Sequence, residues 1–435
     1  MSVGSPAPTG RRGLRPSAGV ILVLGVALAV RVVVVIITRD LPLRDDSYDY
    51  VRLAGLLAHG HGFGDTVLAA GGGPTAFRAP GYPLFLGAVF RVTGDSLTTA
   101  RLLQAVFGTV TVGLIGVVAS QLWDRRHGLV AAGLAAVYPP LVLVGVAVQT
   151  ESISLPLEML VLVVALEHRR RRDGKLWRPA LCGVLVGLCI LTRPANIALI
   201  IPVCLLLMTA RQWRALLVPS AVVGATMLLT LVPWQVRNQT TFHRFVPVST
   251  ADAFILAGVY NDQAAHDPVN RAVWRPPTII PGEAELFKDP RLDEIDLATA
   301  LRKQGTDYAK AHLGYIPVVV AINFAHLFDL TGLARADLGH LSEGYGSGWS
   351  ALWTFSYWIV GAVAIAGAFV KRARDIPLAV WLTPLLFVAV TVPTLGTSRY
   401  RAPIEPFLVL LATVAIIEVA DRWRARSSAP VSAAG

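Results

Sequence analysis

Long apolar stretches, separated by short basic segments, run through most of the chain. Each stretch is long enough, or nearly so, to cross the roughly 30 Å hydrocarbon core of a bilayer as a helix. One of them, residues 179–208, is interrupted by Arg193 and Pro194, and because proline removes a backbone donor we expect a bend between two short helices there. The pattern then predicts an all-α polytopic membrane protein with about ten membrane segments. They cover residues 20–38, 98–123, 129–148, 153–166, 179–208 as a pair, 215–234, 352–370, 377–393 and 404–420.

Compact basic clusters indicate which side of the membrane each loop occupies. With a bent pair at 179–208, every such cluster falls on one side, which the positive-inside rule makes cytoplasmic. Both chain ends, residues 1–17 and 421–435, are then expected in the cytoplasm. The first apolar stretch is expected to be a retained helix because no small-residue cleavage site follows it. The clusters are Arg11 to Arg15, WDRRH (123–127), HRRRRDGKLWR (168–178), RQWR (211–214), KRARD (371–375) and DRWRAR (421–426).

Two large polar loops, residues 39–95 and 237–350, remain on the non-cytoplasmic side. They hold most of the mass outside the membrane, so we expect a multi-pass protein of the plasma (inner) membrane whose site lies on the outer face. Residues 312–330 are apolar enough for a helix, but as a span they would move KRARD outside. We therefore expect this helix along the membrane surface or over the site. The chain, residues 1–435, is treated as a single membrane domain because neither loop is long enough to be a separate one.

The composition agrees with a membrane protein. Hydrophobic residues make up 54% of the chain and charged residues 15%, whereas soluble domains carry about 25% charged residues. A net charge of +11 would suggest nucleic acid in a soluble protein, but here the basic residues sit in short loops, and no nucleic-acid partner is expected. Cys182, Cys189 and Cys204 lie within apolar stretches without CxxC spacing, which indicates buried thiols, not disulfides or zinc ligands.

An acidic pair, Asp45 and Asp46, follows the first apolar stretch and precedes a helix-compatible segment. Asp46 or Ser47 would suit that helix as an N-terminal cap. Other charges reach the same outer boundary, however, and ionisable residues at membrane depth are costly and usually functional. These charges are Glu151, Arg193, Arg237, Arg399 and Arg401.

Each of these charges also has a structural explanation. Arginines near helix ends can extend to lipid headgroups, and Glu151 can complement a helix N-terminus. Taken together, carboxylates and arginines at a lipid interface favour group transfer from a lipid-linked phosphate to a hydroxyl. The leaving phosphate needs cationic stabilisation and no general acid, whereas the hydroxyl needs a base that a carboxylate can supply. No compact ligand cluster indicates a metal, so a divalent cation is left open and no other cofactor is expected.

Seven segments follow one another along the chain in a fixed order. They are DSYDYVRLAGLLAHGHGF, FRAPGYPLFLGAVFRVTG, the YPP of residues 138–140, QTES, LTRPAN, VPWQVRNQTTFHRFVPVST and SRYRAPIEPFLVLLA. In this order they resemble glycosyltransferase family 39, the GT-C family of dolichyl-phosphate-mannose protein mannosyltransferases and of lipid A aminoarabinose transferase. The resemblance implies a GT-C helix bundle, a polyprenyl-phosphate sugar as donor, and an acidic catalytic residue in the first outer loop.

The same resemblance implies particular site residues. The family's Asp, followed four residues later by Tyr, aligns with Asp46 and Tyr50, whereas the acidic pair of the mannosyltransferases would use Asp45. We favour Asp46 as the catalytic base and Asp45 as its neighbour. The donor phosphate is expected at some of Arg193, Arg237, Arg399 and Arg401. The substrate cavity is expected to include Glu151, Tyr50, Arg78, Tyr82 and Tyr400.

The resulting hypothesis is an inverting membrane glycosyltransferase that works on the outer face. A polytopic transporter or flippase of lipid-linked sugars is the main alternative, and a scaffold that binds such a lipid is the third. Transporters often have interrupted helices in corresponding positions of two halves, whereas only residues 179–208 look interrupted here. The sugar stays open, as does the acceptor, which can be a protein, a lipid or a cell-wall glycan, because all of them offer the same phosphate and hydroxyl groups.

Overall fold

The computed structural model describes residues 17–64, 66, 68–70, 72–145, 147–208, 213–342 and 347–428, without the side chains of residues 213–216, 341, 342 and 347. All regular structure in these ranges is helical, which confirms the all-α class. The N-terminal basic cluster, the start of RQWR and the last seven residues lie outside the described ranges.

Most of the predicted membrane segments correspond to single helices. Within the described ranges, four helices are long and apolar enough to cross a membrane: α1 (Ala18–Ile37), α4 (Leu97–Leu122), most of α10 (Trp213–Phe242) and most of α16 (Ser347–Ala368). The others are shorter or carry more charge. They are α7 (Glu151–Arg171), α8 (Trp177–Thr192), α9 (Ile200–Leu207), α18 (Leu378–Thr391) and α19 (Glu405–Ser427).

The bend predicted at Arg193 is confirmed. Helix α8 ends at Thr192, and Arg193 is extended, with φ −145° and ψ 114°. A short 3-10 helix, η1 (Pro194–Leu199), then leads into α9. The Arg169 Nη1 at the end of α7 donates to the Met208 carbonyl at 3.1 Å, so α9 returns to the end of the bundle from which α8 started.

A second break was not predicted. The stretch 129–148 was expected to be one segment, but α5 (Arg125–Val137) stops before Tyr138 and α6 (Pro139–Val144) follows. Tyr138 has ψ 112°, because the residue before a proline is disfavoured in the helical region. The buried Arg31 of α1 donates to the Ala136 and Leu141 carbonyls at 3.1 and 3.3 Å. It thereby satisfies backbone groups that the break leaves unpaired in an apolar interior.

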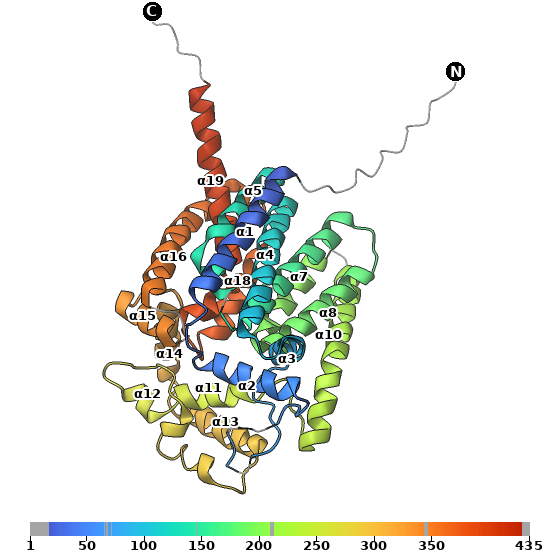
Figure 1. Cartoon of the computed structure of the whole chain (residues 1–435). Coiled ribbons are helices and arrows are strands. Elements are labelled where there is room, and N and C mark those ends of the chain that lie inside the picture. The colour runs from blue at the N-terminus through green and yellow to red at the C-terminus, as the bar shows by residue number, and fades with distance from the viewer. Residues whose placement is uncertain are drawn as a thin grey trace, which may run out of the picture.

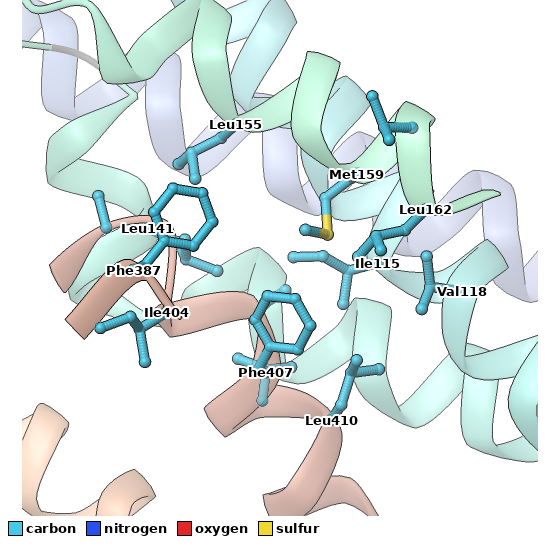
Figure 2. Packing of buried hydrophobic residues seen from close by; sticks show 14 of the residues in the cluster. Ile115, Val118, Leu141, Leu155, Met159, Leu162, Phe387, Ile404, Phe407 and Leu410 are labelled. Atoms are coloured by element: carbon cyan, nitrogen blue, oxygen red, sulfur yellow. The ribbon is translucent and has the colours of Figure 1, made fainter. Parts of the chain in front are cut away.

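Apolar side chains fill the centre of the bundle, and small residues let the helices approach each other. A Cβ at Gly183 would lie 2.3 Å from the Val223 carbonyl oxygen of α10, and one at Gly367 would lie 2.0 Å from the Leu411 carbonyl oxygen of α19. Close contacts of this kind stabilise helix pairs in a membrane, where lipid is as apolar as the protein core. Figure 2 shows the larger side chains, among them Ile115, Leu141, Leu155, Met159, Leu162, Phe387, Ile404, Phe407 and Leu410.

The two ends of the bundle differ in character. The start of α1 and the end of α19 lie together at one end, beside α5 (Figure 1). There the Trp123 indole donates to the Arg372 carbonyl at 3.0 Å, and Asp421 pairs with both Arg126 and Arg372. Basic clusters that are far apart in the sequence therefore meet at this end, which we call the basic end. That it faces the cytoplasm remains a prediction.

The two large loops form helices at the opposite end (Figure 1). The first loop contains α2 (Asp46–Ala58) and α3 (Gly81–Thr93), which pack against each other through Tyr50, Tyr82 and Leu86. In the second loop, Phe254, Leu297 and Leu301 form a small apolar core between two helices. The helices of the second loop are α11 (Ala251–Val259), α12 (Asp262–His266), η2 (Pro277–Ile279), η3 (Leu286–Lys288), α13 (Glu294–Ala311), α14 (Tyr315–Leu327) and α15 (Leu333–Ser342).

Candidate functional site

A cavity of about 530 Å³ opens between the two loops and the ends of the membrane helices opposite the basic end. The first loop contributes Asp45, Asp46, Phe77 and Arg78 to its lining, and the short 3-10 turn η4 (Ser398–Arg401) contributes Ser398 and Tyr400. The second loop supplies most of the remaining wall. Its residues include Phe254, Trp274, Asn323, His326, Asp329 and Arg335.

Asp45 occupies the N-cap position of α2 but does not cap it. Its backbone is in an unusual region, with φ 44° and ψ −120°, and its side chain accepts no capping hydrogen bond. A positive φ costs a residue with a Cβ about 1–2 kcal/mol, and such strain often accompanies a functional constraint. Within the described part of the chain, no hydrogen bond or ion pair engages the exposed Asp45 carboxylate, which faces the cavity. Ser47 closes the turn instead, because its hydroxyl accepts from the Arg44 amide at 2.9 Å.

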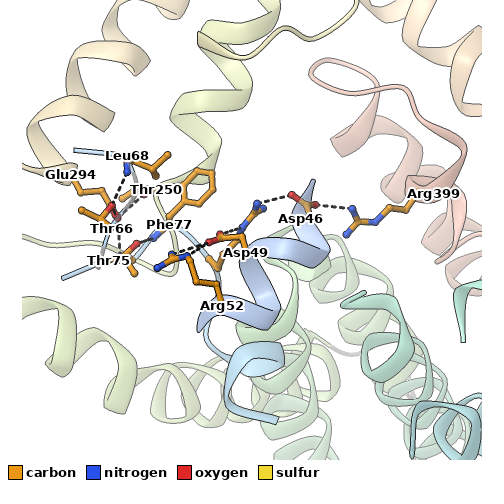
Figure 3. Close-up of polar contacts among 12 residues, drawn as sticks. Asp46, Asp49, Arg52, Thr66, Leu68, Thr75, Phe77, Thr250, Glu294 and Arg399 are labelled. Carbon is orange, nitrogen blue, oxygen red and sulfur yellow. Dashed lines mark hydrogen bonds and ion pairs between the residues drawn. The ribbon is translucent and has the colours of Figure 1, made fainter. Parts of the chain in front are cut away.

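Asp46, in contrast, is held by two arginines. One carboxylate oxygen lies 2.7 Å from Arg78 Nη2 and the other 2.7 Å from Arg399 Nη1. These contacts continue in both directions as an alternating chain of charges, part of which is visible in Figure 3. Arg78 also reaches Asp49 at 2.8 Å, and Arg399 reaches Glu151 at 2.8 Å. We call this chain the cavity network; its members are Arg52, Asp49, Arg78, Asp46, Arg399, Glu151 and Arg193.

The two aspartates consequently differ in basicity. Burial disfavours the ionised form of Asp46, but the guanidinium groups of Arg78 and Arg399 outweigh burial and hold the pKa of Asp46 well below its usual range. Burial and the adjacent charge of Asp46 instead raise the pKa of Asp45 above its usual value. Asp45 is therefore the better proton acceptor of the pair, whereas Asp46 is a permanent anion between two cations.

A second anchor fixes the segment that carries Arg78. The buried Glu294 of α13 accepts hydrogen bonds from the Thr66 hydroxyl at 2.6 Å and from the Ala76 amide at 2.8 Å, both in the first loop. It also accepts from the Thr250 hydroxyl at 3.2 Å. Figure 3 shows this contact beside Phe77 and the cavity network. The second loop thus holds the backbone two residues before Arg78, so that Arg78 can bridge Asp46 and Asp49.

The four arginines expected to hold the donor phosphate are divided by the structure. Arg193 and Arg399 meet at the fully buried Glu151, at 2.9 and 2.8 Å, and Tyr400 lies 5.4 and 5.6 Å from their guanidinium carbons. None of these four arginines lines the cavity, and neither does Glu151, which was expected in it. Arg237 donates to the Thr75 and Phe63 carbonyls, at 3.0 and 2.9 Å.

Arg401 belongs to a separate cluster that is closed to solvent. Its side chain is 0% exposed and pairs with Asp329 at 2.9 Å and with Glu405 at 2.6 Å. Tyr138 donates to Glu405 at 2.6 Å, and the Arg401 guanidinium carbon lies 3.4 Å from the centre of the Tyr357 ring. We call these five residues the Arg401 cluster. With two carboxylates already bound, Arg401 has no room for a phosphate, and we leave it out of the phosphate site proposed below.

The tyrosines expected in the cavity also separate. Tyr400 lines it, whereas Tyr82 is fully buried, donates to Gln104 at 3.0 Å and packs edge-on against Tyr50 at 5.0 Å between the rings. Tyr50 lies under Arg78, with 5.2 Å from ring centre to guanidinium carbon. Burial and the charge of Asp46 raise the pKa of Tyr50 to about 12, so its phenol stays neutral. Tyr50 and Tyr82 therefore support the wall of the cavity from behind.

Sequence reasoning missed Trp274, His326 and Arg335, all of which line the cavity. They lie in the second loop, which was recognised as polar and large but offered no motif. Arg335 is the most informative of them, because its one hydrogen bond within the described residues goes to the neutral Asn270 side chain. No group of three His, Cys, Asp or Glu side chains within the described ranges is placed to hold a metal ion.

Comparison with known proteins agrees with this architecture. Residues 77–236 match the family model described as dolichyl-phosphate-mannose-protein mannosyltransferase. The structure resembles the archaeal oligosaccharyltransferase AglB from Archaeoglobus fulgidus in complex with an inhibitory peptide and a dolichol-phosphate, with a TM-score of 0.56, 15% sequence identity and 94% of this chain covered. The chain has the GT-C fold. The resemblance seen in the motifs is thereby confirmed.

Other matches define how far the likeness extends. An Archaeoglobus fulgidus oligosaccharyltransferase tethered with an acceptor peptide through a disulfide bond matches with a TM-score of 0.56 and 14% identity. The GT-C chain described here spans about half the length of these two relatives, 52% and 50%, and 94% of its own length is covered. ArnT from Cupriavidus metallidurans bound to undecaprenyl phosphate matches with a TM-score of 0.42, 16% identity, and 93% and 79% of the two chains covered. A comparison with curated proteins found no match.

Proposed function

We propose that this protein is an inverting membrane glycosyltransferase that moves a sugar from a polyprenyl phosphate to an acceptor hydroxyl in the cavity between the two loops. One observation carries the proposal: a carboxylate without a partner among the described residues, Asp45, faces a cavity whose opposite charges are arginines. The GT-C fold and the dolichol-phosphate bound to AglB support a lipid-linked donor. The acceptor peptide tethered to an Archaeoglobus fulgidus oligosaccharyltransferase of similar fold supports a second substrate beside the donor.

In the proposed reaction, Asp45 takes over the role of base that the family alignment gave to Asp46. An Asp45 oxygen accepts the proton of the acceptor hydroxyl, the hydroxyl oxygen bonds to the anomeric carbon, and the bond from that carbon to the phosphate oxygen breaks. Polyprenyl phosphate leaves with the bonding electron pair. Because the attack comes from the face opposite to the phosphate, the configuration at the anomeric carbon inverts.

The leaving phosphate requires a cation that carboxylates do not already neutralise. Arg335 meets this requirement best, since its described hydrogen-bond partner is an amide. Arg78 also lines the cavity but shares its charge with Asp46 and Asp49. We therefore propose Arg335, assisted by Arg78, as the phosphate site. Arg193 and Arg399 would hold Glu151 and Asp46 in place. They would thereby support the part of the cavity wall that carries Asp45.

The test uses the purified full-length protein with a panel of radiolabelled polyprenyl-phosphate sugars and cell-envelope acceptors. A glycosyltransferase releases free polyprenyl phosphate in step with labelling of the acceptor. Asp45→Asn should abolish both signals, whereas the control Asp40→Asn, at an exposed aspartate of the same segment, should keep them. Wild-type activity in Asp45→Asn would contradict the assigned base. Movement of the lipid across vesicles without release of polyprenyl phosphate would favour the transporter alternative.

A further inference from the structure

A second groove lies at the basic end of the bundle, remote from the cavity. It has a volume of about 540 Å³ and is bounded by the ends of α16 and α19 and by the short helix α17 (Lys371–Arg374). The two long helices touch closely at Gly367, where an added Cβ would meet the Leu411 carbonyl oxygen. Beside this contact the groove is lined by two alanines, Ala366 and Ala415, which leave space between the helices.

The groove has an apolar wall that is open to the surroundings. Phe369 and Val419 both line it, and their side chains are 71% and 67% exposed. Ile365, next to the groove on α16, is 66% exposed. On a membrane helix, exposed side chains of this kind contact acyl chains.

The rim of the same groove is cationic. Lys371, Arg372 and Arg422 line it together with one carboxylate, Glu418, which leaves a net charge of +2. Arg422 pairs with Glu418 at 3.0 Å, and Arg372 pairs with Asp421 at 3.2 Å. Lys371 has neither an ion pair nor a side-chain hydrogen bond within the described part of the chain. The Arg374 side chain donates to the Phe369 carbonyl at 2.9 Å, which holds the turn between α16 and α17.

We propose that this groove is a binding site for an anionic phospholipid. The phosphate would lie at Lys371 and Arg422, and an acyl chain would lie along Phe369 and Val419. Single basic residues at helix ends commonly extend to the headgroup region. Here, in contrast, three cations line one concave surface, and the wall next to them, with Phe369 and Val419, is apolar. This combination of a basic pocket between helices and an open apolar wall matches the two halves of a phospholipid.

The test is native mass spectrometry of the full-length protein titrated with phosphatidylglycerol or phosphatidylcholine. We expect tighter binding of phosphatidylglycerol. In Lys371→Gln/Arg422→Gln it should bind about 30-fold more weakly, since each cation near an anionic lipid contributes about 1 kcal/mol and 1.4 kcal/mol corresponds to tenfold. Ala366→Trp, which fills the groove without changing its charge, should weaken binding of the same lipid. Inorganic phosphate at millimolar concentration should not displace it.

Matched controls make the result decisive. Arg424→Gln/Arg426→Gln removes two exposed cations from the same helix end but outside the groove, and Ala362→Trp adds the same bulk one turn earlier on α16. Both should bind phosphatidylglycerol like the wild type. Equal weakening in the controls, equal binding of phosphatidylcholine, or displacement by inorganic phosphate would overturn the proposal. Thermal unfolding of every variant shows whether it is folded, and Ala366→Trp tests the groove even where the charge variant is unstable.

Discussion

Two clusters of charged residues lie at the end of the bundle that carries the two loops. Their central arginines, Arg399 and Arg401, are only two residues apart in the sequence. The cavity network is partly open: Asp46 keeps 22% of its side chain exposed, and the exposed Asp45 stands next to it. The Arg401 cluster is closed, with Arg401, Asp329 and Glu405 each at most 3% exposed. Both contain an arginine bridging two carboxylates, but the cavity network borders the cavity through Asp46 and Arg78, whereas the Arg401 cluster reaches it only through the nearly buried Asp329.

The difference shows how the same chemistry can serve catalysis or architecture. In the Arg401 cluster, every charge is paired, and a neutral tyrosine completes the shell. Buried pairs of this kind tie helices together, here α19 and the segment after α14, and leave nothing for a ligand. The cavity network pairs Asp46 with two arginines, but the neighbouring Asp45 has no ion pair within the described residues. A charged residue that the network supports but does not neutralise is the one suited to act on a substrate.

The largest expected effect comes from breaking the closed cluster. Arg401→Met should lower the free energy of unfolding by about 3–5 kcal/mol, because it leaves two buried carboxylates without a cation. Denaturant unfolding in detergent measures this loss. The matched control is the triple change Arg401→Met, Asp329→Leu, Glu405→Met, which removes all the charges and should recover most of the stability. A triple variant as unstable as the single one would show that the cluster is not a self-contained unit.

Arg335 should behave differently, because we place it at the phosphate and not in a closed cluster. Arg335→Gln should raise KM for the polyprenyl-phosphate sugar by about 10- to 100-fold, corresponding to a lost charged hydrogen bond of about 1.5–3 kcal/mol. The unfolding free energy should stay near that of the wild type. Steady-state kinetics provide the measurement, with Arg302→Gln, which removes an exposed pair with Asp252, as the control. An unchanged KM would remove Arg335 from the phosphate site.

The pH profile tests whether Asp45 or Asp46 is the base. Activity should fall as the pH drops through the raised pKa of Asp45, because the protonated carboxyl cannot accept a proton. In Asp46→Asn the neighbouring negative charge is gone and two arginines lose a partner, so the pKa of Asp45 falls. The acid limb of the rate profile should therefore move to lower pH while measurable activity remains. Complete loss of activity at every pH in Asp46→Asn would favour Asp46 as the base.

The smallest expected effect concerns the anchor between the loops. Glu294→Gln weakens charged hydrogen bonds to Thr66 and Ala76, and we expect a loss of about 1–2 kcal/mol of stability together with a severalfold lower turnover. The control is Glu285→Gln, an exposed glutamate of the same loop. Differential scanning fluorimetry and the release assay give the two readouts. A stability loss without any change in turnover would mean that the anchor does not position Arg78.

Much of the fold followed from the sequence because membrane insertion is a local property. A run of apolar residues long enough to span the bilayer forms a helix wherever it occurs, since its backbone can satisfy its hydrogen bonds only internally. Pro194 predicted a bend because proline removes one backbone donor from such a helix. The break at Tyr138 was missed because its compensation, Arg31, comes from another helix more than a hundred residues away.

The site was accessible from the sequence only in part. Hydropathy and charge predicted that the acidic pair and five further charges share one end of the membrane helices, and the family resemblance added Arg78. The five are Glu151, Arg193, Arg237, Arg399 and Arg401. The tertiary structure alone decided what each one does. Arg399 and Arg401 stand in the same short motif, and the sequence does not distinguish their roles. In the structure, Arg399 forms ion pairs with Asp46 and Glu151, whereas Arg401 forms ion pairs with Asp329 and Glu405. The reactivity of an ionisable group depends on partners brought from distant segments, and no local pattern records those partners.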